Sequence, residues 1–400
     1  MDGMLSGVSG EQFIERDRSG NELPAYRGKV VEPRNGHDIH LTIDMQLQDI
    51  VEGICEREWK SHQAKRVVIV VTDPFTGSIL AAAARPHRDS ENPDESTWTN
   101  HVHGGLYEPG STFKIVTLAA ALDMKKVTPT EIIDCEDWHW FEPKLKVWIN
   151  DDESNGRQTV KGVLVHSSNI GTYKIFKRIG RDSLLDYAKR FGFGQRTGIG
   201  LSGEQPGILP MGKWSNPTQK NVCVGYNLNT TPLHVALAYG AVANGGTLMQ
   251  ARIIDRITTP EGKVEQVPPQ PVGQACTAAT AAHLRDFLEG VVLEGTGRRA
   301  SLAPEIRVAG KTGTSVRYDD KLNKYIPNHY VTSFAGFAPV ESPKVTCVVM
   351  LDDPVAKDHH DIRGGKVASP IFAEVVRETL HHLATRHQKR MNLAQKGGQQ

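Results

Sequence analysis

The sequence predicts an α+β fold in which one antiparallel sheet of about five strands, built from both chain ends, carries an inserted helical lobe. Apolar runs with strand character lie near both ends of the chain: 66–72, 78–84, 306–314, 330–337 and 345–351. The long stretch between them, about 110–300, is helical in period and punctuated by glycine turns. Strands at both ends with helices between them indicate that remote segments share one sheet, flanked by helices.

The N-terminal part divides into a linker and the first elements of the domain. Residues 1–36 are polar and glycine-rich, which predicts irregular structure, and a compact domain is expected from residue 37. Met45–Trp59 has apolar residues at helical spacing, with Asp44 placed to cap the helix. The apolar runs 66–72 and 78–84 flank a turn that contains Gly77, which predicts a β-hairpin.

The C-terminal part closes the domain. A helix is expected from about Ser369 to Arg386, so that the domain ends near residue 387, and residues 388–400 are expected to form a polar, disordered tail. Five scattered cysteines without CxxC spacing argue against a disulfide framework or a zinc site, and we expect buried thiols: Cys55, Cys135, Cys223, Cys276 and Cys347.

Composition limits the classes of function. A chain of 400 residues with 38% hydrophobic content can bury a substantial core. Lys+Arg 47 against Asp+Glu 46 gives a net charge of +1, so no global field favours nucleic acid as a partner. The sequence has no apolar run of membrane-spanning length and no export signal, so we expect either a cytoplasmic protein or one whose targeting segment lies outside this sequence.

A serine and a lysine three residues apart form the first candidate site. Ser111 and Lys114 follow Pro109-Gly110 at the start of an apolar helical run, so both side chains fall on one face and the amine can reach the hydroxyl. A serine needs such a base to act as a nucleophile, and a lysine serves as base only if its pKa is depressed. The alternative is a helix start with Ser111 as N-cap and Lys114 exposed.

Two further motifs follow in the regions that this fold brings together. Ser167 and Asn169 form an SxN motif in the helical part, where each could also be a turn or cap residue. Lys311-Thr312-Gly313-Thr314 lies on a predicted strand and offers a cation and two hydroxyls. Gly313 is expected to let a ligand backbone approach closely.

SxxK, SxN and KTG in this order form the motif set of penicillin-binding proteins and class A β-lactamases. Around them, residues 37–387 resemble the transpeptidase domain of class B penicillin-binding proteins, which have a β-lactamase-like fold with the active site in a cleft between lobe and sheet. Glu108-Pro109 before the serine is similar to the division and sporulation branch, whose best-known member is penicillin-binding protein 3. Residues 1–36 then correspond to a remnant of the N-terminal pedestal region.

The resemblance implies a peptidoglycan D,D-transpeptidase that β-lactams acylate and inhibit. Ser111 would attack the carbonyl between two terminal D-alanines, Lys114 would take the proton, and Ser167 would relay it to the departing D-alanine. Asn169 would bind the peptide backbone and help to fix Lys114. A substrate carboxylate would pair with Lys311.

The same resemblance assigns the remaining site residues and the surroundings. The hydroxyls of Thr312 and Thr314 would also bind the carboxylate, and the backbone N–H groups of Ser111 and Thr314 would form the oxyanion hole. The implied partners are peptidoglycan stem peptides, β-lactams, a membrane glycosyltransferase and division proteins, with no cofactor or metal. The implied location is the bacterial inner membrane, with the catalytic domain on its outer side and the anchor outside this sequence.

Other functions agree less well with the sequence. Hydrolysis of the acyl-enzyme would make the protein a D,D-carboxypeptidase or β-lactamase, but no ExxLN-like segment lies between Asn169 and Lys311 to activate water. A non-catalytic β-lactam sensor would keep the serine without turnover. A P-loop is disfavoured because Glu305 occupies its first glycine position. Two clusters, His101 with His103 and residues 358–361, are expected to be solvated loops instead of metal sites.

Overall fold

The computed structural model describes residues 2–23, 30–87, 99–319, 322, 324–355 and 362–397. The chain folds into two compact units. The larger unit comprises Ile43–Ala251 and Pro269–Gln400, and the smaller comprises Met1–Thr42 and Arg252–Pro268. The larger unit contains every residue of the three motifs.

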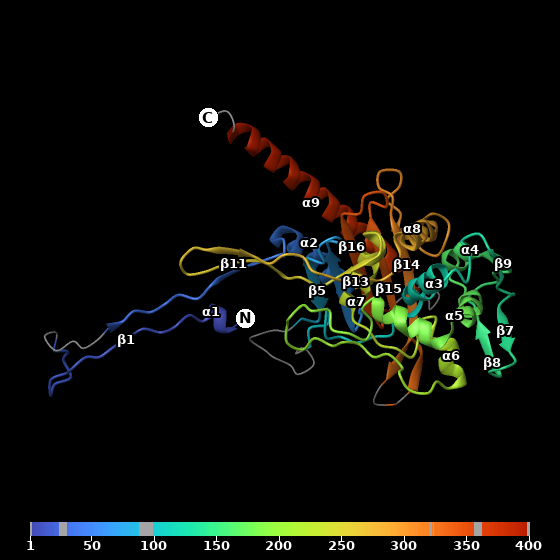
Figure 1. Cartoon of the computed structure of the whole chain (residues 1–400), viewed down its shortest axis with the longest axis horizontal. Coiled ribbons are helices and arrows are strands. Elements are labelled where there is room, and N and C mark those ends of the chain that lie inside the picture. Colours follow the sequence, from blue (N-terminus) through green and yellow to red (C-terminus); the bar gives the residue numbers. More distant parts are fainter. Residues whose placement is uncertain are drawn as a thin grey trace. The chain divides into compact units, whose positions relative to one another are not determined.

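A five-stranded antiparallel sheet forms the centre of the larger unit (Figure 1). In spatial order its strands are β14 (Ala309–Asp319), β15 (Lys324–Ala338), β16 (Val345–Asp352), β4 (Arg66–Thr72) and β5 (Ile79–Arg85). The pairing of β16 with β4 joins the two ends of the chain, with Cys347 opposite Val71. The predicted α+β fold and the sheet built from remote strands are therefore confirmed.

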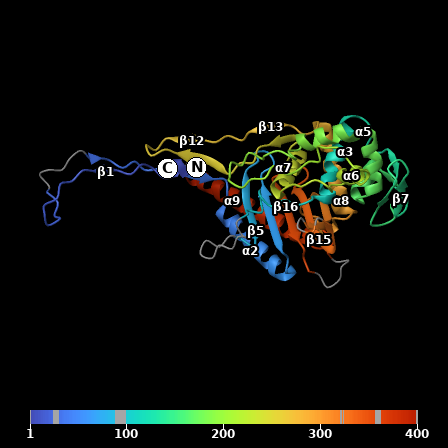
Figure 2. The same ribbon diagram turned by 90° about the horizontal axis from the view of Figure 1, so that it is seen from below.

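Helices cover both faces of this sheet. Helices α2 (Met45–His62) and α9 (Ala368–Gly397) share one apolar cluster with Val67, Ile69 and Val71, which lie on one face of β4. Because side chains alternate along a strand, Val68 and Val70 lie on the opposite face, where α7 (Pro232–Ala243) packs. Burial on both faces explains why the strand is a continuous apolar run. Figure 2 shows α2 beside β5, with α3, α5 and α6 at the other end of the sheet.

The start of α2 and the end of α9 can be compared with the boundaries predicted from the sequence. Asp44 caps α2 as expected, because its side chain accepts hydrogen bonds from the backbone N–H groups of Gln46 and Leu47. The expectation of a disordered tail at 388–400 was wrong for residues 388–397, since α9 continues to Gly397, and residues 398–400 lie outside the described part of the chain. The stretch 388–397 contains mostly Gln, Lys, Arg, Leu and Ala and no proline, and these residues favour a helix even without an apolar stripe.

The region 110–300 contains most of the helices. They are η3 (Gly110–Phe113), α3 (Lys114–Asp123), α4 (Val160–Val165), α5 (Asn169–Arg190), α6 (Asn216–Val222), α7, α8 (Ala278–Leu293) and η4 (Arg298–Ala300). The expectation of a helical lobe was incomplete, since short strand pairs also occur: β6 (Ile132–Asp134) with β9 (Arg157–Thr159), β7 (His139–Glu142) with β8 (Val147–Asn150), and β10 (Thr247–Met249) with β13 (Pro271–Gln274). Three or four residues are too few to produce a detectable alternation of apolar and polar side chains.

The smaller unit is built from short elements. Its three-stranded sheet has the order β12 (Val264–Gln266), β11 (Ile254–Thr258) and β3 (Asp38–Leu41). A helical turn, α1 (Asp2–Leu5), and a two-residue ladder of β1 (Glu11–Gln12) with β2 (Val30–Val31) precede it. Because β3 pairs with β11, the boundary expected at residue 37 falls after Thr42. None of the described helices is both long and apolar enough to cross a membrane.

Candidate active site

The backbone around Ser111 is fixed by close contacts between glycines. Ser111 lies in the 3₁₀ turn η3, directly after Gly110, whose φ is 54°. The Gly110 N–H donates to the carbonyl of Gly225 at 3.0 Å. A Cβ at Gly225 would lie 2.0 Å from the Gly110 carbonyl oxygen, so only glycine fits there. The turn that carries Ser111 is thus held against the loop after α6.

Lys114 is a fully buried cation on an otherwise apolar helix. Every residue from Lys114 to Leu122 in α3 is buried, and the exposed fraction of Lys114 is 0%. Its Nζ donates to the Ser167 carbonyl at 2.5 Å, to Asn169 Oδ1 at 2.7 Å and to Ser167 Oγ at 3.2 Å. Burial lowers the pKa of Lys114 to about 8, against the opposing effect of the Asp151 and Asp152 charges. The amine can therefore be neutral near physiological pH.

Ser167 connects the lysine to the nucleophile. Its hydroxyl donates to Ser111 Oγ at 3.0 Å and accepts from Lys114 Nζ. Among the residues that the structure describes, Lys114 has no hydrogen bond to Ser111 itself, so the expected direct contact is replaced by a bridge through Ser167. The alternative interpretation was wrong on both points, because Ser111 makes no side-chain capping bond and Lys114 is buried.

Asp151 organises the SxN motif, and sequence reasoning missed it. Its buried carboxylate accepts from the Ser168 hydroxyl at 2.6 Å and from the backbone N–H groups of Asn169 at 2.5 Å and Ile170 at 3.1 Å. These bonds anchor the start of α5, where Ser167 has a φ of 60°, a conformation that non-glycine residues seldom adopt. A carboxylate sixteen residues before Ser167 belongs to no local motif, so only the fold reveals it.

Strand β14 supplies the third motif beside these residues. Lys311 is fully buried, and its Nζ donates to the Thr312 hydroxyl at 3.2 Å. Burial, with the Lys114 charge as a smaller cause, depresses the pKa of Lys311 far below its usual range. The Thr312 hydroxyl also hydrogen-bonds that of Thr296, at 2.8 Å, which is a second contact that the sequence did not indicate.

Gly313 packs closely against other parts of the protein. A Cβ there would lie 2.3 Å from Ser333 Oγ and 3.0 Å from the Pro109 carbonyl oxygen. The missing side chain therefore lets other parts of the protein approach β14 at this position. Gly110 also approaches β14 closely, because a Cβ at Gly110 would lie 3.0 Å from the Thr314 carbonyl oxygen. The segments that hold the two expected oxyanion donors, Ser111 and Thr314, are thus in contact.

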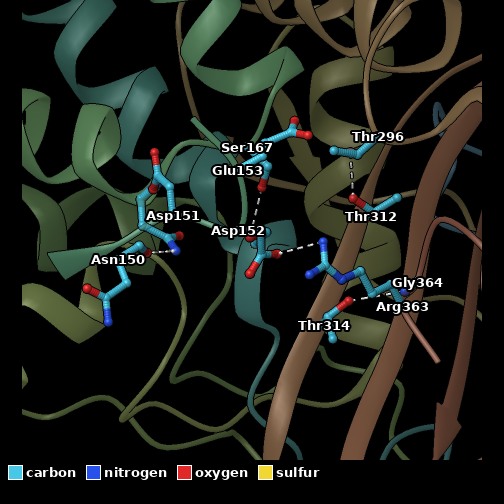
Figure 3. Close-up of polar contacts among 12 residues, drawn as sticks. Asn150, Asp151, Asp152, Glu153, Ser167, Thr296, Thr312, Thr314, Arg363 and Gly364 are labelled. Carbon is cyan, nitrogen blue, oxygen red and sulfur yellow. Dashed lines mark hydrogen bonds and ion pairs between the residues drawn. The ribbon is translucent and has the colours of Figure 1, made fainter. Parts of the chain in front are cut away.

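Charged and polar side chains surround the three motifs (Figure 3). Thr314 Oγ1 accepts a hydrogen bond from the Gly364 N–H at 3.1 Å. The guanidinium of Arg363 pairs with the Asp152 carboxylate at 3.6 Å. Figure 3 shows these two side chains extending toward each other between Ser167 and Thr314. The structure therefore brings together seven predicted side chains and Gly313, from η3, α3, the start of α5 and β14.

The other interpretations of the sequence, as a P-loop, a metal site or a disulfide framework, can be compared with the structure. Residues after Lys311 continue β14 instead of opening a helix, which excludes a P-loop. His101 and His103 were wrongly expected to be solvated, since both are buried and burial lowers the pKa of each imidazole. No group of three metal-ligating side chains occurs in the described part of the chain, and the cluster at 358–361 lies outside it. All five cysteines are buried and unpaired, as predicted.

Comparison with known families agrees with this geometry. The profile of the penicillin binding protein transpeptidase domain matches residues 67–377, which include all three motifs. The chain belongs to this family. The chain is 34% identical over 394 residues to stage V sporulation protein D of Bacillus subtilis, covering 96% of this chain and 60% of that protein. It is 30% identical to the probable peptidoglycan D,D-transpeptidase PenA of Neisseria meningitidis, covering 95% of this chain and 63% of PenA.

Solved structures share the fold. Penicillin-binding protein 3 of Mycobacterium tuberculosis in complex with aztreonam superposes with a TM-score of 0.80 at 28% identity, over 92% of this chain and 87% of that one. The apo transpeptidase domain of Burkholderia pseudomallei penicillin-binding protein 3 gives a TM-score of 0.74 at 31% identity, over 86% and 96% of the two chains. These relatives confirm the predicted resemblance to the division and sporulation branch.

Proposed function

We propose that this protein is a peptidoglycan D,D-transpeptidase with Ser111 as the acylated nucleophile. The observation that carries the proposal is the hydrogen-bonded series from Lys114 through Ser167 to Ser111, with a lysine whose pKa of about 8 suits a general base. The family match and the names of relatives such as PenA support the same reaction. The chain spans less than two thirds of those relatives, so the activity is proposed for the transpeptidase domain.

In the acylation step, Ser111 Oγ attacks the carbonyl carbon of the penultimate D-alanine of a stem peptide. The serine proton passes through the Ser167 hydroxyl to neutral Lys114. When the peptide C–N bond breaks, the same proton returns through Ser167 to the departing D-alanine nitrogen. The backbone N–H groups of Ser111 and Thr314 stabilise the oxyanion, and losing one such donor typically costs about 10²–10³ in rate.

In the second step, the amine of a neighbouring stem peptide attacks the acyl-enzyme carbonyl. Its proton leaves by the same Ser167 and Lys114 path, the new amide forms, and Ser111 regains its hydroxyl proton. In the first step, before D-alanine departs, its terminal carboxylate binds the hydroxyls of Thr312 and Thr314, which lie on one face of β14. An incoming carboxylate favours the protonated form of the buried Lys311 amine, which contacts Thr312, and pairs with it.

The cellular setting follows from the same proposal. The enzyme acts in the bacterial cell envelope, on peptidoglycan stem peptides, and β-lactams acylate the same serine. An inner-membrane anchor and contacts with a glycosyltransferase and division proteins are proposed for the whole protein. Stage V sporulation protein D and penicillin-binding protein 3 are the relatives whose names support a role in division or sporulation.

The test is intact-mass spectrometry after exposure to benzylpenicillin, with the adduct located by peptide digestion. We expect one adduct, on Ser111, and none in the Ser111→Ala variant. A D,D-pentapeptide with an added amine acceptor should then release D-alanine mainly as the cross-linked product. An adduct elsewhere would contradict the assignment, release without the acceptor would indicate a carboxypeptidase, and labelling without any turnover would indicate a sensor.

A further inference from the structure

Asp152 and Arg363 each lie next to a residue that is hydrogen-bonded to the catalytic site. Asp152 follows Asp151, whose carboxylate binds the backbone at the start of α5. Arg363 precedes Gly364, whose N–H donates to Thr314 Oγ1. A Cβ at Gly364 would lie 2.4 Å from the Gly313 carbonyl oxygen, so the chain is pressed against β14 at this point. The backbone positions of both charged residues are therefore fixed relative to the nucleophile.

The side chains of this pair are much less constrained than their backbones. The closest approach of Arg363 and Asp152 is 3.6 Å, and their side chains are 50% and 75% exposed. An exposed pair of this kind contributes little to stability. Asp152 nevertheless acts on the catalytic site, because its charge opposes the lowering of the pKa of both Lys114 and Lys311. The two charges are thus close to the reaction and free to accept other partners.

We propose that Asp152 and Arg363 form a specificity site for a stem-peptide side chain that ends in a free amino-acid group. The Asp152 carboxylate binds the ammonium and the Arg363 guanidinium binds the carboxylate on the same terminal carbon. This inference rests on the proposed function and names the substrate class of that site. Diaminopimelate, whose side chain ends in this way, is the preferred third residue, and lysine, which ends in an amine alone, is disfavoured.

The geometry favours a ligand with both charges. Opposite charges 3.6 Å apart match an ammonium and a carboxylate attached to one carbon. A ligand with an amine alone would occupy Asp152 and deprive Arg363 of its partner. A guanidinium can bind a carboxylate through two parallel hydrogen bonds, which gives geometric selectivity as well as affinity. Exchange of the protein's own ion pair for two ligand pairs also leaves neither charge unpaired.

The experiment compares two penicillins with the same six-carbon 6-acylamino chain, one ending in an amino-acid group and the other in a primary amine alone. The second-order acylation rate constant is measured for each with the full chain. We expect the unmodified protein to favour the amino-acid probe by about tenfold, the value of one charged hydrogen bond. Arg363→Gln should reduce this ratio to near one. Asp152→Asn should slow both probes when rates are compared above about pH 8, where Lys114 is already neutral and loss of the Asp152 charge no longer changes its protonation.

The matched control removes another exposed ion pair, between Lys161 and Asp286, which joins at 2.9 Å. Lys161→Gln should leave both rates and their ratio unchanged. A ratio within twofold of one in the unmodified protein, or a ratio that survives Arg363→Gln, would overturn the specificity site. Acylation of Ser111 by benzylpenicillin would still support the proposed function in that case, whereas no acylation by any of the three penicillins would overturn both.

Discussion

Lys114 shows how one residue acquires a chemical role from its surroundings. A lysine on an apolar helix face would be an unfavourable placement if its amine remained charged and without partners. Here three acceptor atoms, from Ser167 and Asn169, satisfy the amine, and burial lowers its pKa to about 8. The same residue therefore has both the hydrogen bonds and the basicity that proton transfer from Ser111 requires.

The rate of acylation should depend on pH through this lysine. Below its pKa, Lys114 is protonated and cannot accept a proton, so the benzylpenicillin acylation rate should rise about tenfold per pH unit and level off above about pH 8. Stopped-flow measurement between pH 6 and 9.5 gives the profile. A rate that does not change across this range would exclude Lys114 as the base.

Asp151 is predicted to be a positioning residue. Asp151→Asn removes the charged acceptor for the backbone of Asn169 and Ile170, so the plateau rate of acylation should fall by about tenfold or more. Because the Asp151 charge opposes the lowering of the Lys114 pKa, the rising limb should also move to lower pH. Asp286→Asn, at an exposed position, is the control. If Asp151→Asn lowers the plateau rate but leaves the rising limb of the pH profile at the same pH, the predicted electrostatic effect on Lys114 is contradicted.

At the scale of elements, the site depends on how η3 fits between its neighbours. The Glu108 carboxylate accepts from the Asn227 N–H at 2.7 Å and from the Tyr325 hydroxyl at 2.9 Å. The carbonyl of the same residue accepts from the Ser315 hydroxyl at 2.9 Å. The segment before the nucleophile is thereby tied both to the loop after α6 and to the hairpin of β14 and β15. Glu108, which marked the family branch in the sequence, thus also has a structural role.

A pair of glycine substitutions tests this fit. Gly225 and Gly200 both have positive φ, 91° and 72°, but only Gly225 contacts η3. Gly200→Ala should cost about 1–2 kcal/mol of stability through backbone strain alone. Gly225→Ala should lower stability further and slow acylation, because its Cβ would displace Gly110. Equal acylation rates in the two variants would show that the contact does not position Ser111.

At the scale of the whole larger unit, one apolar cluster supports both the sheet and the site. Phe334 on β15 is opposite Thr312 on β14, and its ring packs against that of Phe372 on α9, with centroids 4.6 Å apart. A Cβ at Gly310 would lie 2.4 Å from the Phe334 ring, so β14 fits closely over this contact. The C-terminal helix thereby supports the strand that carries the third motif.

Removal of this contact should destabilise the protein strongly. Phe372→Ala leaves a cavity in the core and should lower the free energy of unfolding by about 3–5 kcal/mol. Phe75, which is 53% exposed, provides the control, since Phe75→Ala should change it by less than about 0.5 kcal/mol. Urea denaturation followed by near-ultraviolet circular dichroism measures both, and similar midpoints would contradict the assigned core.

The sequence alone predicted features that depend on local patterns. The apolar runs predicted the central strands, Asp44 predicted the start of α2, and the three short motifs predicted Ser111, Ser167 and Lys311, because each signal lies within a few neighbouring residues. The short strands and the helical end of α9 escaped prediction, since three residues show no period and a polar helix has no apolar stripe.

The tertiary structure decided what depends on distance in space. Only folding buries Lys114, places Ser167 between it and Ser111, and brings Asp151 to the start of α5. It also packed Gly313 against Ser333 and Pro109, and brought Arg363 to Asp152, 211 positions earlier in the sequence. Burial, electrostatic coupling and close backbone approach depend on residues that are far apart in the sequence, so no local sequence pattern determines them.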